Sequence, residues 1–226
     1  MTRLRQMTGL SKLIAVWGAI TIMSGAFLTV SYGAHAASTH IPIFNSSETT
    51  SPRINLFPKW GGALERYFGE RKLQGGTCEA SFFNRCHLRE WSEFLAGLKG
   101  QDAISQVHEV NRYMNRVRYI TDPRNYGIPD YWATPKQFLT RNGDCEDYAI
   151  AKYLSLRSLG FQPSQLRIVV LQDLNLKIAH AILVVDLNGQ ALVLDNQIAS
   201  VVNARTIHHY KAIYSINEKF WWLHRS

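Results

Sequence analysis

Helical periodicity dominates the first part of the chain. Apolar residues recur there every three or four positions, which is the spacing of an amphipathic helix. Three segments share this pattern: residues 59–70, 88–98 and 102–118. A fourth helix is predicted from Cys145 to about Leu159, because Gly160 suits the left-handed position that commonly ends a helix. Residues 121–142 lack a helical period and are predicted to form a long ordered loop in front of Cys145.

The pattern changes to short apolar runs in the last part of the chain. Four runs are rich in β-branched or aromatic side chains and are bounded by turn residues: 166–171, 180–185, 191–194 and 210–216. Asn188-Gly189 separates the second run from the third and is a strong signal for a two-residue hairpin. Helices followed by a meander of strands predict an α+β fold, with a helical lobe packed on an antiparallel β-sheet.

The first 36 residues have the pattern of an export signal. Three basic residues open it: Arg3, Arg5 and Lys12. An apolar run over 13–30 follows, and Ala34-His35-Ala36 fits a small-x-small cleavage site. A cleaved signal peptide over 1–36 is therefore predicted. An uncleaved membrane anchor stays open as the alternative, because a run of 18 residues approaches the minimum for a membrane span.

The remaining chain divides into a polar arm and one folded domain. Residues 37–58 are polar and lack periodicity, so an irregular N-terminal arm is predicted. Residues 59–226 carry the helices and strands and are predicted to form a single domain. The formal net charge is +8, but the basic residues are dispersed and no basic run is interleaved with aromatic residues. We therefore expect no nucleic-acid partner.

Three cysteines limit the redox chemistry of an exported chain. An odd number in an oxidising compartment leaves one thiol unpaired. Cys78 and Cys86 lie eight residues apart in a loop-like stretch and are predicted to close a small disulfide. Two reduced, buried cysteines are the alternative at these positions. With the disulfide formed, Cys145 is the free thiol.

Cys145 is placed at the start of a predicted helix, directly after Gly143-Asp144. The unpaired N–H groups and the dipole of a helix N-terminus favour the thiolate form of a cysteine. Asp144, Glu146 and Asp147 oppose that form unless a cation offsets their charge. Clustered carboxylates suit calcium, but carboxylates in a first helical turn also act as N-terminal caps. The residues alone leave both roles open.

The Asn188-Gly189 hairpin is predicted to bring His180 and Asp195 together. A two-residue turn pairs Leu187 with Gln190, which makes His180 and Asp195 diagonal neighbours on one face of the sheet. Diagonal Cα atoms lie roughly 7–8 Å apart, within reach of an imidazole–carboxylate hydrogen bond.

A cysteine at a helix start, a histidine and an aspartate form the set that acyl transfer by a thiol requires. His180 would accept the thiol proton of Cys145 and later protonate the leaving amine, while Asp195 would fix the ring orientation. The backbone N–H of Cys145, at the helix start, is a candidate oxyanion donor. The sequence therefore predicts a Cys145–His180–Asp195 catalytic triad.

Four segments of the chain carry a family resemblance: Asp130-Tyr131-Trp132-Ala133-Thr134-Pro135 with Phe138-Leu139, Gly143-Asp144-Cys145-Glu146-Asp147-Tyr148-Ala149, Ala179-His180-Ala181, and Leu194-Asp195-Asn196. Together they resemble the bacterial transglutaminase-like cysteine proteases of the LapG type. The resemblance extends from about residue 55 to the end of the chain. The turn around Cys145 is its most specific part.

The resemblance implies a papain-like fold and a periplasmic, calcium-dependent protease. It implies that Cys145 is the nucleophile, His180 the base and Asp195 the orienting acid. It also ties Asp144 and Glu146 to calcium, and Asp147 less securely. The implied substrate is the N-terminal region of a large surface adhesin, whose cleavage releases the adhesin and disperses biofilm. The implied inhibitory partner is an inner-membrane receptor for cyclic diguanylate.

Two other functions fit the same residues. A transglutaminase or another acyl transferase uses an identical first half-reaction and differs only in the acceptor, an amine instead of water. A non-catalytic binding module stabilised by calcium would keep the fold with an inactive triad.

Overall fold

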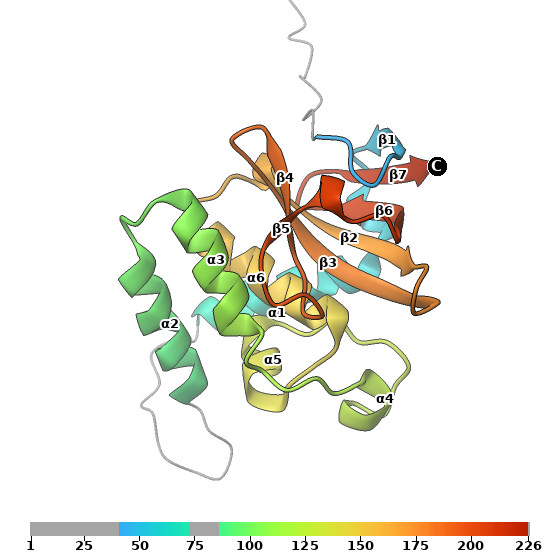
Figure 1. The fold of residues 1–226 in the computed structure, drawn as a ribbon. Coiled ribbons are helices and arrows are strands. Elements are labelled where there is room, and N and C mark those ends of the chain that lie inside the picture. Colours follow the sequence, from blue (N-terminus) through green and yellow to red (C-terminus); the bar gives the residue numbers. More distant parts are fainter. Residues whose placement is uncertain (1–40, 73–85, 226) are drawn as a thin grey trace, which may run out of the picture. The chain divides into compact units, whose positions relative to one another are not determined.

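The computed structural model describes residues 41–72 and 86–225, and Figure 1 shows their arrangement. The predicted signal peptide over 1–36 lies outside these residues, and so does Cys78, with it the predicted disulfide to Cys86. Within the two described ranges, no helix is long and apolar enough to cross a membrane.

The described helices fall mostly where the apolar period predicts them. The α-helices are α1 (Pro58–Lys72), α2 (Cys86–Leu98), α3 (Ala103–Met114), α4 (Asp122–Asn125), α5 (Pro135–Arg141) and α6 (Cys145–Ser158). Short 3-10 turns are η1 (Ile54–Leu56), η2 (Pro163–Gln165) and η3 (Ala204–Thr206). Helix α6 is the central one, because every residue from Asp147 to Leu156 is buried. It packs against β2 and β3 on one side and against α3 and α5 on the other.

Seven strands form one antiparallel sheet in the described part of the chain. They are β1 (Ser47–Ser51), β2 (Leu166–Asp173), β3 (Ile178–Leu187), β4 (Gln190–Leu194), β5 (Val202–Asn203), β6 (Tyr210–Ile216) and β7 (Trp221–Arg225). Their order across the sheet is β1-β7-β6-β2-β3-β4-β5. Figure 1 shows β1 and β7 at one edge, with helices α2 and α3 on the far side of the fold. The predicted α+β class is confirmed.

The hairpin between β3 and β4 has the predicted register. Leu187 pairs with Gln190 and Leu183 with Leu194. Asn188 and Gly189 have φ values of 51° and 74°, the left-handed pair that a two-residue hairpin of this kind requires. This register fixes which β4 residues lie beside the start of β3.

Each face of the sheet covers its own hydrophobic core. The larger core lies between the sheet and the helices and includes Trp60, Tyr153 and Leu183. The smaller core lies on the other face, where Ile182 and Tyr210 belong to the sheet. The segment before β1 completes this second core with Ile43, which is buried.

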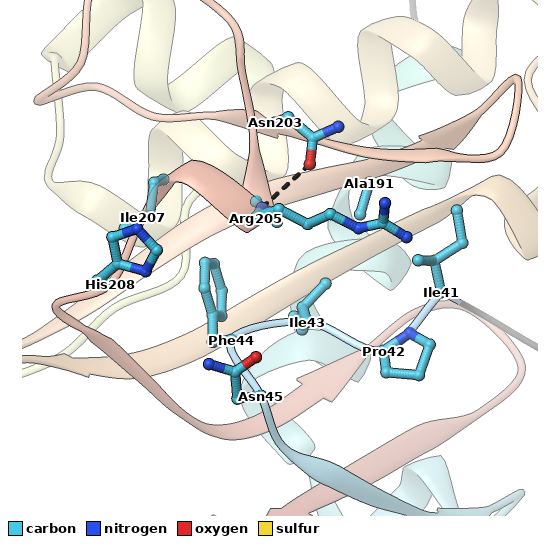
Figure 2. Close-up of a pocket in the computed structure, with 11 residues that line it drawn as sticks. Ile41, Pro42, Ile43, Phe44, Asn45, Ala191, Asn203, Arg205, Ile207 and His208 are labelled. Atoms are coloured by element: carbon cyan, nitrogen blue, oxygen red, sulfur yellow. Dashed lines mark hydrogen bonds between the residues drawn. The ribbon is translucent and has the colours of Figure 1, made fainter.

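A pocket of about 190 Å³ lies beside this N-terminal segment, and Figure 2 shows its lining. Phe44 and Ile43 face η3 across the pocket, where the backbone N–H of Arg205 donates to Asn203 Oδ1 at 3.0 Å. None of the three predicted triad residues lines the pocket. The pocket is therefore separate from the predicted catalytic site.

The predicted irregular arm over 37–58 is wrong for residues Ser47–Ser51. These residues form β1, which pairs with β7 from Ser47↔Arg225 to Ser51↔Trp221. Their sequence, SETTS, contains no apolar alternation and so gives no strand signal. The strand depends instead on pairing with a segment that lies far away in sequence.

The predicted loop over 121–142 contains two short helices, α4 and α5. Helix α5 has a capping box, in which Thr134 Oγ1 accepts from Gln137 N–H at 3.2 Å and Gln137 Oε1 accepts from Thr134 N–H at 3.0 Å. Pro135 follows at the first helical position. This Thr-Pro-x-Gln pattern is a signal for a helix start that the sequence contains. The helix was not predicted from apolar spacing, because seven residues are too few to show a helical period.

Candidate active site

His180 and Asp195 lie where the hairpin register predicts them. His180 is on β3, and Asp195 follows the last residue of β4. Their side chains form a hydrogen bond of 2.9 Å between His180 Nε2 and Asp195 Oδ1, and both side chains are almost completely buried. Because Nε2 is bonded to the carboxylate, Nδ1 is the ring nitrogen that faces other groups, and the side-chain Nε2 of Gln197 lies 3.5 Å from it.

Asp195 is fixed on several sides. Tyr210 Oη donates to Oδ2 at 2.7 Å, and the backbone N–H of Gln197 donates to Oδ1 at 2.8 Å. Asn115 Nδ2 donates to the backbone carbonyl of Asp195 at 2.8 Å. Burial alone would raise the pKa of Asp195, but the hydrogen bond and charge of His180, together with the hydrogen bonds from Gln197 and Tyr210, lower it. Asp195 is therefore an ionised, immobilised partner of the imidazole.

Cys145 is the first residue of α6, as predicted, and its thiol is a free one. Its Sγ donates to Glu146 Oε2 at 3.1 Å, and the backbone N–H of Ala181, the residue after His180, lies near enough to lower the pKa of the thiol. The Ala181 contact places the thiol beside the strand that carries the imidazole. The thiol donates to Glu146 and not to His180.

The environment of the Cys145 thiol favours its protonated form. Burial is the largest cause of its raised pKa, and the negative charges of Glu146 and Asp144 raise it further. The backbone N–H of Ala181 lowers the pKa of the thiol, but by less than these causes raise it. Neutralising the charges of Glu146 and Asp144 would therefore favour the thiolate.

The carboxylates around Cys145 belong to a larger acidic cluster. Oxygens of Asp122, Asp144 and Asp147 lie within 4.8 Å of one another, and so do oxygens of Asp122, Asp130 and Glu146. Burial and mutual repulsion raise the pKa of Glu146 to about 9 and that of Asp147 to about 8. Burial, with the charges of Asp144 and Asp130, raises the pKa of Asp122 to about 6. A cation held among these carboxylates would offset this repulsion.

The cluster fits a calcium ion chemically. Calcium takes oxygen ligands only, from carboxylates and carbonyls. Asp122 Oδ1 and Asp144 Oδ1 are buried without a hydrogen-bond partner, so both are open to a cation. Other oxygens of these residues are already bonded: Asp144 Oδ2 accepts from Asp122 N–H at 3.2 Å. Asp122 therefore belongs to the candidate metal site, although the sequence reasoning omitted it.

The capping role of Asp147 is present as well. Its Oδ2 accepts from the backbone N–H of Asp144 at 3.3 Å, which is an N-terminal cap of α6. Its Oδ1 accepts from the backbone N–H of Ala133, which ties the preceding loop to the helix. Asp147 thus caps the helix while it lies in the acidic cluster, and the two roles that the sequence left open coexist there.

Backbone contacts explain how Asp122 reaches Cys145. Tyr119 and Gly143 form a parallel bridge, and Ile120 N–H donates to Gly143 carbonyl at 2.9 Å. Asp122 follows this bridge directly, so its carboxylate lies beside the first turn of α6. In the sequence, the Asp122-Pro123 pair gave only a weak signal that Asp122 belongs to the site. The bridge between Tyr119 and Gly143 joins segments that are distant in sequence, so no local pattern predicts it.

Comparison with known proteins identifies the family of the chain. The family model of bacterial transglutaminase-like cysteine proteinases matches residues 78–224. LapG of Legionella pneumophila is 30% identical over 71% of this chain and 87% of its own, with a TM-score of 0.57. No match was found among curated proteins.

Two further structures of Legionella pneumophila LapG match the chain. The calcium-bound form is 30% identical over 71% of this chain and 87% of its own, with a TM-score of 0.58. The EGTA-treated form is 29% identical over 73% of this chain and 87% of its own, also with a TM-score of 0.58. The family match covers more than half of the chain, and the LapG structures share its fold. The chain belongs to the bacterial transglutaminase-like cysteine proteinases and is a LapG-type member of that family.

Proposed function

We propose that this chain is a calcium-dependent cysteine endopeptidase that uses Cys145 as nucleophile, His180 as base and Asp195 as orienting acid. The observation that carries the proposal is the buried 2.9 Å bond between His180 Nε2 and Asp195 Oδ1. The same oxygen also accepts from the backbone N–H of Gln197, which fixes the carboxylate. That bond uses Nε2, so the proton transfer is assigned to Nδ1. Ala181, the next residue on the strand, has its backbone N–H near the Cys145 thiol. Family membership supports the assignment of the nucleophile.

The reaction follows from these positions. The thiol proton of Cys145 moves to His180 Nδ1, and the thiolate attacks the substrate carbonyl carbon, forming a C–S bond. The imidazolium then gives this proton to the leaving amine as the C–N bond breaks. Water attacks the thioester, His180 takes the water's proton and returns it to sulfur, and the acid product leaves. Asp195 holds the ring in the tautomer with Nε2–H throughout.

The oxyanion of the tetrahedral intermediate requires a hydrogen-bond donor. The backbone N–H of Cys145 is suited to this role, because the first N–H groups of a helix have no partner within the helix. Gln197 offers a side-chain donor near the same site, because its Nε2 lies 3.5 Å from His180 Nδ1.

Calcium has a defined place in the proposal. Asp122 and Asp144 would hold it together with Asp147, Asp130 or Glu146, since their oxygens converge and two are unpartnered. A bound calcium ion supplies positive charge beside Cys145 and offsets the carboxylates that raise the thiol pKa. The existence of calcium-bound and EGTA-treated forms of Legionella LapG supports the choice of metal.

The biological role extends the proposal. We propose that the substrate is the N-terminal region of a large surface adhesin, and that cleavage releases the adhesin and promotes biofilm dispersal. We also propose a periplasmic location, which the export pattern of residues 1–36 supports. An inner-membrane receptor for cyclic diguanylate is proposed as the inhibitory partner. These three statements rest on the likeness to LapG-type proteases.

The test is a product analysis. The protein is incubated with calcium, a primary amine and the N-terminal region of a large adhesin encoded in the same genome, and the products are identified by mass spectrometry. We expect two fragments with a free carboxylate at the new C-terminus, and no fragments with Cys145→Ala. An amide formed with the added amine would identify a transglutaminase instead.

A second arm separates an enzyme from a binding module. Iodoacetamide should alkylate Cys145 in the presence of calcium, and His180→Ala should slow the alkylation severalfold because the thiolate loses its counter-ion. Equal alkylation rates in both proteins, with no cleavage of the adhesin region, would favour a non-catalytic module.

A further inference from the structure

Strand β3 is longer than the strand that pairs with its outer edge. On one side, β2 pairs with β3 from Ile178 to Val185. On the other side, β4 pairs with β3 only from Leu183 to Leu187. Residues 178–182 therefore have no strand partner on the β4 side in the described part of the chain. An unpaired edge of this kind offers backbone N–H and C=O groups to an added strand.

The alternation of an antiparallel ladder shows which residues point to this edge. Leu187 and Gln190 close the two-residue hairpin as a hydrogen-bonded pair, so every second residue back along β3 directs its backbone groups toward β4. Ala181 and Ala179 are in this set. The influence of the Ala181 N–H on the pKa of the Cys145 thiol agrees with this direction for Ala181.

Ala179 is the next position along the same edge. It lies two residues before Ala181, a displacement of roughly 7 Å along the strand. It is exposed, while Ala181 is only 4% exposed. Its backbone N–H and C=O face the side of β3 that β4 leaves unpaired, one residue away from His180.

The turn that leads into this edge exposes large apolar side chains. Leu174, Leu176 and Ile178 are 51%, 56% and 47% exposed. The turn is nonetheless well defined, because Asp173 Oδ1 accepts from the N–H groups of Asn175 and Leu176 at 2.8 and 3.0 Å. An apolar surface next to a free strand edge and a thiol is suited to an extended polypeptide.

We propose that the edge of β3 at Ala179 is the substrate-binding edge: an extended polypeptide segment with apolar side chains joins the sheet there as an added strand. Backbone hydrogen bonds to Ala179 would hold the chain in line with Cys145, and Leu176 and Ile178 would contact its apolar side chains. This inference rests on the proposed function and specifies how its substrate is bound. It favours an unfolded, apolar stretch of the substrate over a folded surface.

The first experiment modifies the substrate and leaves the protein unchanged. A peptide that spans the cleavage site is made as a series, each member carrying one N-methylated backbone amide. Strand pairing uses the amides of alternate residues only. We expect methylation at alternate positions on one side of the scissile bond to reduce kcat/KM about tenfold or more, and methylation at the positions between to have less than a threefold effect. A uniform effect, or none, would overturn the proposal.

The second experiment changes the edge. Ala179→Pro removes the N–H that faces the free edge, while residues 178 and 180 keep the backbone groups that pair with β2. We expect kcat/KM for the unmodified peptide to fall about tenfold and the alkylation rate of Cys145 by iodoacetamide to stay within twofold. Unchanged kcat/KM would contradict the proposal. Failure of the proposed function is distinguishable, because the wild-type protein would then leave the unmodified peptide uncleaved, or Cys145→Ala would still cleave it.

Discussion

Tyr210 contacts both members of the His180–Asp195 pair. Its hydroxyl donates to Asp195 Oδ2 at 2.7 Å, and its ring lies edge-on to the His180 ring with centroids 6.0 Å apart. It thereby holds the carboxylate in the rotation that presents Oδ1 to Nε2. Tyr210 acts through Asp195, so it is a positioning residue.

Tyr210→Phe should lower kcat about tenfold with KM unchanged, because a hydrogen bond to a charged group contributes about 1.5 kcal/mol. The measurement is steady-state cleavage of a peptide substrate. Tyr153→Phe is the matched control, since that buried hydroxyl donates to Glu218 at 3.4 Å, away from the site. If kcat falls by the same factor in both variants, the effect is a general loss of stability and the positioning role of Tyr210 is wrong.

The residues of the candidate site differ in how far the sequence predicts them. The hairpin register predicted the His180–Asp195 contact, because a two-residue turn fixes both strands. Tyr210 and Asp122 were not identified as site residues. Each reaches the site through tertiary contacts between segments that are distant in sequence, and no periodicity encodes such contacts. The metal-binding and catalytic roles themselves remain predictions.

The first turn of α6 is the element on which the site depends. A Cβ atom at Gly143 would lie 2.8 Å from both Cβ and Cγ of Asp147, so only glycine fits beside that carboxylate. The turn therefore combines a glycine, a helix cap and the thiol in a short stretch. We expect its acidic residues to make its stability dependent on pH and, under the proposed function, on calcium.

Without calcium, the free energy of unfolding should fall as the pH rises from about 5 to 9. Burial raises the pKa of Glu146 to about 9 and of Asp147 to about 8, from ordinary values of 4.5 and 3.8. The folded chain thus keeps protons that the unfolded chain has already released in this range, and deprotonation favours unfolding.

Thermal unfolding in EGTA and in calcium, at several pH values, measures this effect. Calcium binds the ionised carboxylates of the folded chain, so it should raise the midpoint most at high pH. The same pH dependence with and without calcium would exclude the acidic cluster as the metal site.

Secondary structure was predictable where a period or a turn signal extends over enough residues. The long helices and the strands of the meander meet this condition. Strand β1 and helix α4 do not, because β1 is polar and α4 has only four residues. Both depend on contacts with distant parts of the chain.

Buried polar contacts hold Ser46 and Glu48, at the start of β1, against β2 and β7. Arg167 on β2 is fully buried and donates to both carboxylate oxygens of Glu48 on β1 at 2.9 Å. His224 on β7 links Ser46 and Ser215 by contacts of 2.8 and 2.9 Å. Burial, with the nearby charge of Arg167, lowers the pKa of His224 to about 4, so its ring is neutral at pH 7.

Glu48→Gln should reduce the free energy of unfolding by about 3 kcal/mol, because it leaves the buried guanidinium of Arg167 without its counter-charge. Denaturant unfolding is the measurement. Glu93→Gln is the matched control: Glu93 pairs with Arg89 on the surface at 3.6 Å, and its loss should change stability by less than about 0.5 kcal/mol. Equal effects of the two substitutions would contradict the fastening role of Glu48.

The most direct test of a calcium-dependent cysteine protease is the initial rate of adhesin cleavage as a function of calcium concentration. Wild type should show no cleavage in EGTA and full recovery when calcium is restored. Asp122→Asn should require a higher calcium concentration, because it removes a carboxylate from both oxygen clusters. Cys145→Ala should be inactive at every concentration. Cleavage that persists in EGTA, or in Cys145→Ala, would contradict the mechanism.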